Sequence, residues 1–256
     1  MSFKEKMEET SKKKNSNIIL ALDFPFYSPE KREELLIKAQ EVLDAVHLYI
    51  CAVKINHHLV LPLGTFDGVQ KLISQAHKKE LLTIMDCKAN DIGTTNQVIS
   101  EYYYAANFDA LIANPFIGWE EGLKPIFDTA HRLQRGVILL SYMSHKGACE
   151  GYGQTICDKE TGKAISQYVS FARKALKWSA DGAVVGATYP DKIREIHEIL
   201  GESVPIYSPG IGAQGGLAKT ALEAGAHYLI VGRKISMANN PGEVARRLFS
   251  AIQQMK

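Results

Sequence analysis

The stretch LLTIMDCKANDIGTTN, residues 81–96, indicates the fold, because it passes from a buried strand to a polar loop within a few residues. Its first half is a near-continuous apolar run, which is typical of a strand that is buried on both faces of a parallel sheet. Asp86, Lys88 and Asp91 then follow within six residues, where the strand ends. The stretch therefore predicts one strand–loop unit with ionisable side chains at the carboxyl end of its strand.

Similar units recur along the chain, separated by segments with helical spacing such as residues 30–46. Eight strand–helix units with nothing left over predict a closed (β/α)₈ TIM barrel, and an open doubly wound sheet is the alternative. We expect a single domain over residues 1–256, with the barrel at 17–256 and an N-terminal helical extension at 1–16. The expected strands are residues 17–24, 45–56, 81–88, 110–116, 136–144, 182–189, 204–211 and 228–234.

Composition excludes several classes of protein. The 256 residues are 46% hydrophobic and 23% charged with a net charge of +2, so no broad positive field for nucleic acid is present. No apolar run is long enough to span a membrane, and no signal-peptide pattern occurs, which predicts a cytoplasmic protein. The four cysteines lack metal-ligand spacing and are expected to be free thiols.

Reactive side chains gather at the carboxyl ends of the expected strands, which is where TIM barrels carry their sites. Asn114 and Thr188 fit ordinary turn chemistry, whereas the charged residues do not. The polar residues at these strand ends are Asp23, Lys54, Asp86, Lys88, Asn114, Ser144, Thr188, Ser208 and Arg233. The pattern predicts a site at one rim of the barrel.

Three of these charged residues, together with Asp91 from the following loop, are expected to form a row across the mouth. Asp86 and Lys88 are two residues apart and face the same side of a strand, and Lys54 ends the neighbouring strand. Asp91 follows in the next loop. Flanking carboxylates would hold Lys88 as an ammonium ion, which is a suitable general acid toward a basic carbon. The alternative is an ion-pair network with a purely structural role.

The segment SPGIGAQGG, residues 208–216, contains a GxGxxG pattern. A dinucleotide site would require an acidic residue about 20 positions later, and the next expected strand ends in Gly232-Arg233 instead. In a barrel, the loops after the seventh and eighth strands commonly bind phosphate. Gln214 and Arg233 are therefore predicted to bind a phosphorylated small molecule, and a tight turn with a surface arginine is the alternative.

At this point the chain resembles the orotidine 5′-monophosphate decarboxylase family, in family order from residue 17 to about 241. The DxKxxD core alone is shared with Mg²⁺-dependent sugar-phosphate relatives, but Lys54 and the glycine-rich turn favour the decarboxylase. A sugar-phosphate lyase and a non-catalytic phosphate binder remain the alternatives. The segments that carry the resemblance are ALDF (21–24), VKIN (53–56), MDCKANDIGTTN (85–96), MSHKGA (143–148), SPGIGAQGG (208–216) and VGRKI (231–235).

The resemblance implies a catalytic role for four residues, Lys54, Asp86, Lys88 and Asp91. Asp86 would crowd the substrate carboxylate, and Lys88 would protonate the C6 carbanion that is left when CO₂ departs. Asp91 and Thr95 would reach into the neighbouring site of a homodimer. The resemblance implies no cofactor and no metal.

It also implies how the substrate, a phosphorylated pyrimidine nucleotide, would be bound. Asp23 and Lys54 would hold ribose hydroxyls, and Ser144 would contact the amide edge of the pyrimidine. Gln214 would bridge phosphate and base, and Arg233 would hold the phosphate. The residues expected to bind substrate are Asp23, Lys54, Thr95, Ser144, Pro209, Gln214, Gly232 and Arg233.

Three further expectations concern segments outside this set. Residues 145–162 form a long connection that is rich in glycine and charge, which predicts a lid over the base. Tyr102-Tyr103-Tyr104 are consecutive aromatics, so one must face outward, where a dimer contact or a wide buried face would explain it. His197 and several other histidines lack ligand spacing and are expected to serve packing or the surface.

Overall fold

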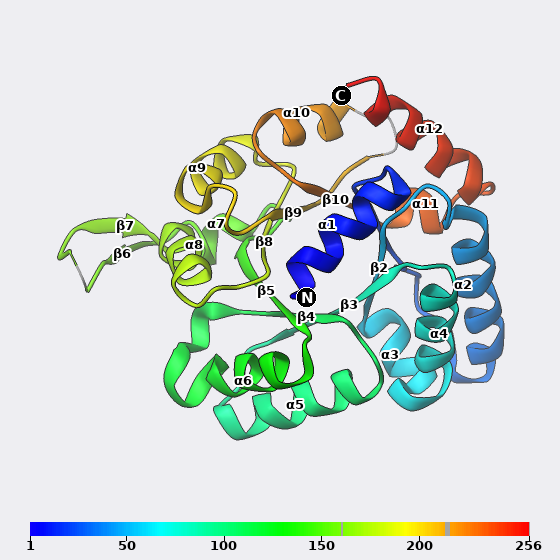
Figure 1. The fold of residues 1–256 in the computed structure, drawn as a ribbon, viewed down its shortest axis with the longest axis horizontal. Helices are drawn as coiled ribbons and strands as arrows, with labels where there is room; N and C mark the ends of the chain where they lie inside the picture. Colours follow the sequence, from blue (N-terminus) through cyan, green and yellow to red (C-terminus); the bar gives the residue numbers. More distant parts are fainter. Residues whose placement is uncertain (160, 213–215, 256) are drawn as a thin grey trace.

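The computed structural model describes residues 1–159, 161–212 and 216–255, and it contains the predicted closed barrel (Figure 1). The strand order is β1-β10-β9-β8-β5-β4-β3-β2. All pairings within the barrel are parallel, and β1 pairs with both β2 and β10, which excludes the open sheet. The barrel strands are β1 (Ile18–Ala21), β2 (Ala52–Asn56), β3 (Leu82–Ala89), β4 (Ala110–Ala113), β5 (Gly136–Tyr142), β8 (Gly182–Val185), β9 (Ile206–Pro209) and β10 (Tyr228–Val231).

Helices surround the barrel, as expected from the alternation of strand and helix signals (Figure 1). None of the helices in the described part of the chain is long and apolar enough to cross a membrane. The longer helices are α1 (Phe3–Lys14), α2 (Arg32–Val46), α3 (His57–Leu63), α4 (Gln70–Lys78), α5 (Gly93–Ala105), α6 (Lys124–Leu133), α8 (Gln167–Lys177), α9 (Pro190–Leu200), α10 (Gly216–Glu223) and α12 (Pro241–Gln253). Shorter turns are η1 (Pro29–Lys31), η2 (Gly64–Val69), η3 (Pro115–Ile117), η4 (Trp119–Leu123), α7 (Ala148–Gly151) and α11 (Arg233–Ser236).

The interior of the barrel is apolar at its centre. Ile19 of β1 and Ile84 of β3 belong to a buried cluster inside the barrel, whereas Leu20 and Met85 pack between the strands and the helices. This alternation follows from the two-residue period of a strand. The inward-facing positions that follow these apolar layers along each strand therefore lie at the carboxyl end of the barrel.

Helix α1 closes the opposite, amino-terminal end of the barrel, where it crosses the centre of the view in Figure 1. Ser2 and Glu5 form a capping box at its start. Phe3 and Met7 are fully buried and join the cluster inside the barrel. A Cβ on Gly136 would lie 2.4 Å from Cγ of Phe3, so the first residue of β5 has to lack a side chain. The expected N-terminal helix is therefore present as a plug, and the division of the chain at residue 16 stays a prediction.

The connection after β5 differs from the expected lid. It forms α7 and then an antiparallel hairpin of β6 (Thr155–Cys157) and β7 (Ala164–Ser166). Figure 1 shows this hairpin projecting sideways beside α8, away from the centre of the barrel. Arg173 of α8 contacts Asp158 at 2.5 Å and ties the hairpin to the helix. In this structure the hairpin is an arm on the side of the barrel, whereas Tyr152, before the hairpin, still packs on Tyr142 at the end of β5.

Candidate active site at the carboxyl end of the barrel

Three strand ends bring charged side chains together above the apolar interior. In β2 and β3, Ala52 and Ile84 face inward, so the two-residue period also directs Lys54 and Asp86 inward. The register pairs Asn56 with Asp86 and places Lys54 one layer lower. The expected positions of Lys54 and Asp86 at the barrel mouth therefore follow from the observed strand alternation.

Asp86 is held between two lysines. Its Oδ2 lies 2.5 Å from Lys54 Nζ, and its Oδ1 lies 2.6 Å from Lys88 Nζ. The side chains of Lys54 and Asp86 are only 7% and 8% exposed, whereas that of Lys88 is 37% exposed. Burial alone would raise the pKa of Asp86, but the two ammonium groups outweigh it and lower the pKa below its ordinary value. The group is therefore a buried carboxylate with one half-exposed ammonium that faces the opening.

Lys88 reaches this position through an irregular backbone. Its φ is +51°, in the left-handed region that non-glycine residues rarely adopt. The pairing of β3 with β4 shifts between Met85 and Ala89, which marks a bulge at this point. Bulges commonly re-aim a side chain near a functional site. Burial raises the pKa of the adjacent Cys87 thiol to about 12, which disfavours its thiolate form.

Asp91 and Thr95 lie apart from this cluster within one chain. Both residues are exposed at the start of α5, and Asp91 Oδ1 accepts a hydrogen bond from Ile92 N–H at 2.7 Å. Among the residues that the structure describes, the ion pairs of Lys54 and Lys88 go to Asp86 and none goes to Asp91. The expected row of four charges is thus a group of three in a single chain.

Asp23 continues the polar layer on the other side of Lys54, since Ala21 of β1 pairs with Lys54. Its Oδ1 accepts a hydrogen bond from Asn56 Nδ2 at 2.8 Å. A Cβ on Gly232 would lie 2.5 Å from Asp23 Oδ2, so a glycine is required where β10 ends. Sequence reasoning did not select Asn56, although its place at the end of the VKIN strand was an available signal.

The glycine-rich turn is only partly described. Pro209 ends β9 and pairs with Ile230 of β10, and Gly210 has a φ of +97°. Arg233 is exposed at the first position of α11. Gln214 lies outside the described residues. The two loops that were expected to bind phosphate therefore begin at adjacent strands.

Ser144 stands beside the start of that turn. A Cβ on Gly210 would lie 3.2 Å from Ser144 Cβ, and one on Gly186 would lie 2.6 Å from Ser144 Cα. The serine thus lies between the ends of β8 and β9. The structure brings Lys54, Asp86 and Lys88 into direct contact, joins Asp23 to them through neighbouring strands, and places Ser144 near the turn.

Comparison with known proteins identifies the family. The model of the orotidine 5′-phosphate decarboxylase / HUMPS family matches residues 16–248. The chain belongs to this family. It is 34% identical to orotidine 5′-phosphate decarboxylase of Methanosarcina mazei, in a match that covers 94% of this chain and 96% of the relative. It is 35% identical to the enzyme of Pyrococcus abyssi, in a match that covers 92% of this chain and 99% of the relative. The resemblance that the motifs indicated is thereby confirmed.

A solved structure from the family agrees with this fold. Orotidine 5′-monophosphate decarboxylase from Methanocaldococcus jannaschii, crystallised with the inhibitor BMP, superimposes with a TM-score of 0.76 at 29% identity. The match covers 92% of this chain and 98% of that one. The barrel fold of this chain is therefore shared with a decarboxylase of known structure.

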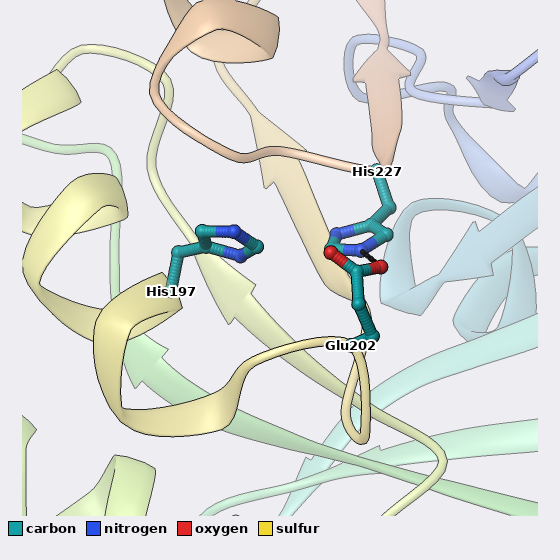
Figure 2. A group of neighbouring side chains, drawn as sticks. All are labelled: His197, Glu202 and His227. Carbon is teal, nitrogen blue, oxygen red and sulfur yellow. Dashed lines mark hydrogen bonds and ion pairs between the residues drawn. The ribbon is translucent and has the colours of Figure 1, made fainter.

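A second polar group in this family member, His197, Glu202 and His227, lies at the opposite end of the barrel (Figure 2). Its possible ligand atoms lie within 4.8 Å of one another. However, Ile206 N–H donates to His227 Nδ1 at 3.1 Å, so the neutral ring carries its proton on Nε2, which faces Glu202 at 3.3 Å. A protonated nitrogen has no lone pair for a metal. We interpret the group as a packing contact: Glu202, in the turn after α9, is hydrogen-bonded to His227 just before β10, and the His197 ring of α9 lies 5.7 Å from the His227 ring.

Proposed function

We propose that the protein catalyses decarboxylation of orotidine 5′-monophosphate to UMP and CO₂ without a metal or cofactor, the last step of de novo pyrimidine nucleotide biosynthesis. The observation that carries this proposal is the buried Lys54–Asp86–Lys88 group, with one ammonium facing the mouth. The names of the relatives support the same activity. The reaction must stabilise a carbon base that has no conjugated electron sink, and a fixed ammonium does this electrostatically.

The proposed chemistry uses Lys88 as the acid and Asp86 as the charged neighbour of the substrate carboxylate. The C6–carboxylate bond breaks, its electron pair stays on C6, and CO₂ leaves. Lys88 Nζ then donates a proton to C6, so that UMP forms, and the amine regains a proton from solvent. Repulsion between Asp86 and the substrate carboxylate would raise the energy of the bound ground state and would be relieved when CO₂ departs.

Binding groups away from C6 would hold the rest of the nucleotide. In the proposal Asp23 and Lys54 contact ribose hydroxyls, and Ser144 contacts the pyrimidine amide edge. Pro209 and Gly232 border the substrate where the strands end. Phosphate binding falls to Gln214 and Arg233. Binding energy from the phosphate, remote from the bond that breaks, can raise kcat by positioning the reacting groups.

A homodimer is part of the proposal, with Asp91 and Thr95 completing the neighbouring site. The exposure of both residues supports this, and among the described residues Lys54 and Lys88 pair with Asp86 rather than with Asp91. Apolar side chains around α5 are also unusually exposed, namely Ile92 at 60% and Tyr102 at 59%. Tyr104, by contrast, is buried, so one tyrosine of the triplet faces outward as expected. A cytoplasmic location is part of the same proposal, and it rests on membership of the decarboxylase family.

The direct test follows orotidine monophosphate by ultraviolet absorbance in the presence of excess chelator. Loss of the substrate signal is expected, and Lys88→Ala should abolish it while changing phosphate-ligand affinity by less than about tenfold. Turnover of a sugar phosphate only, and only with Mg²⁺, would instead identify a metal-dependent lyase. Tight binding of the nucleotide with no turnover would identify a non-catalytic binder.

A further inference from the structure

The segment between β8 and α9, residues 186–189, bridges two parts of the barrel mouth. On one side, Gly186 N–H donates to Tyr142 O at the end of β5 at 2.8 Å. On the other side, Ala187 N–H donates to Pro209 O at the end of β9 at 2.8 Å. These bonds fix the segment between the loop that carries Ser144 and the start of the glycine-rich turn.

Two hydroxyl groups of the same segment donate hydrogen bonds to the backbone around Ser144. Thr188 Oγ1 donates to Ser144 O at 3.0 Å, and Tyr189 OH donates to His145 O at 3.0 Å. His145 O also accepts a hydrogen bond from Ala148 N–H at 3.1 Å, which starts the turn into α7. Two consecutive backbone carbonyls, those of Ser144 and His145, are thus held from one neighbouring loop.

The Tyr189 ring is itself held in place. It packs edge to face on Tyr142, with 5.0 Å between the ring centroids, and Tyr142 is 3% exposed. Tyr142 is the last residue of β5, two residues before Ser144. The hydroxyl of Tyr189 is therefore presented from a packed aromatic group rather than from a free surface side chain, which lowers the entropy lost in holding the loop.

Close packing makes the position of Ser144 sensitive to these bonds. The absence of a Cβ on Gly186 and on Gly210 leaves just enough space for the serine between the two strand ends. A shift of the Ser144 backbone would either collide with β8 or separate the serine from the turn at Gly210.

We propose that Tyr189 and Thr188 are positioning residues, which fix Ser144 relative to the glycine-rich turn so that base and phosphate are recognised together. This inference rests on the proposed function, in which Ser144 contacts the pyrimidine. In this proposal neither hydroxyl contacts the substrate. Their effect is on binding geometry, transmitted through the Ser144 and His145 carbonyls.

The test is Tyr189→Phe, which removes only the hydroxyl and keeps the ring on Tyr142. Loss of one neutral hydrogen bond is expected to raise KM for orotidine monophosphate about three- to tenfold, with kcat changed less than about twofold. Thr188→Val should act in the same direction. Tyr168→Phe is the matched control, because Tyr168 contacts the same Tyr142 ring but donates its hydroxyl to Glu195, away from the loop.

A double-mutant cycle with Ser144→Ala separates positioning from general loss of structure. If Tyr189 acts through Ser144, Tyr189→Phe should raise KM little further in the Ser144→Ala background. The inference would be overturned if the increases in KM of the two single variants multiply in the double variant, if Tyr189→Phe leaves KM unchanged, or if the Tyr168→Phe control raises KM equally. Absence of turnover by the wild-type protein would overturn the proposed function and this inference with it, whereas the other outcomes overturn the inference alone.

Discussion

At the scale of single residues, the site depends on how Lys88 is placed. Strict alternation along β3 predicted that Asp86 and Lys88 share a face, and their charged groups do meet at 2.6 Å. The path is different from the expected one, because Lys88 has a left-handed backbone at a bulge. A bulge depends on pairing with the next strand, so the local sequence could indicate the contact but not the conformation that makes it.

Asp86 offers a residue-scale test of ground-state repulsion. Turnover is first prevented with Lys88→Ala, and binding is then compared with and without the added Asp86→Ala change. Removing the carboxylate should tighten binding of orotidine monophosphate, which bears a carboxylate, and should leave UMP affinity less affected. The measurement is the Kd of each nucleotide by calorimetry. Weaker binding of orotidine monophosphate in the double variant would refute the repulsion mechanism.

The single change Asp86→Ala should also slow decarboxylation about a hundredfold or more, because an electrostatic group at the reacting centre is lost. Thermal unfolding has to accompany this measurement, since removal of one partner from a buried ion pair destabilises a fold by about 3–5 kcal/mol. Asp86→Asn, which keeps the volume of the side chain, is the matched variant for folding.

At the scale of secondary-structure elements, each expected strand has a counterpart, but the one expected at 45–56 is strand only at Ala52–Asn56, because residues 45–46 end α2. Two connections also have shapes that periodicity did not reveal. Helix α1 was expected only as an extension, and it fills the amino-terminal end of the barrel with Phe3 and Met7. Residues 145–162 were expected as a lid, and most of them form α7 and a hairpin arm instead. Where a segment docks depends on contacts that are distant in sequence, so neither outcome was readable from local pattern.

Phe3→Ala tests whether the plug stabilises the barrel without serving the site. Phe3 is fully buried, and its loss should lower the free energy of unfolding by about 3–5 kcal/mol, measured by chemical denaturation. KM should stay unchanged because the plug lies at the end opposite the mouth. Lys12→Ala is the control on the exposed face of α1 and should leave stability almost unchanged. A Phe3→Ala protein as stable as the wild type would show that α1 does not seal the core.

At the scale of the whole molecule, the barrel separates two ends with different roles. The amino-terminal end is filled by α1, and the carboxyl end collects Asp23, Lys54 and Asp86 above the apolar interior. Asp91, which was expected to complete the charge row, points to solvent in a single chain. The site of one chain therefore lacks one of its expected acids, and the proposed dimer would supply it.

Mixing two inactive variants tests this sharing of sites. Lys88→Ala and Asp91→Ala should each be inactive alone. In a mixed dimer, one site combines the intact Lys88 of one chain with the intact Asp91 of the other, so statistical mixing should restore about a quarter of the wild-type activity. Activity is measured after the subunits are dissociated and reassociated. A mixture that stays inactive, with mixed dimers shown to be present, would place Asp91 outside the neighbouring site.

The amino-acid sequence by itself determined the barrel, its strand count and the residue types at its mouth, because strand burial and strand-end polarity are local patterns with a short period. It also indicated the family through motifs in order. Only the tertiary structure decided that Lys88 lies on a bulge, that Asp91 is separate from the Lys54–Asp86–Lys88 group within one chain, and that Tyr189 donates a hydrogen bond to the loop of Ser144. These features arise from contacts between strands and loops far apart in the chain, and such contacts exist only once the barrel has closed.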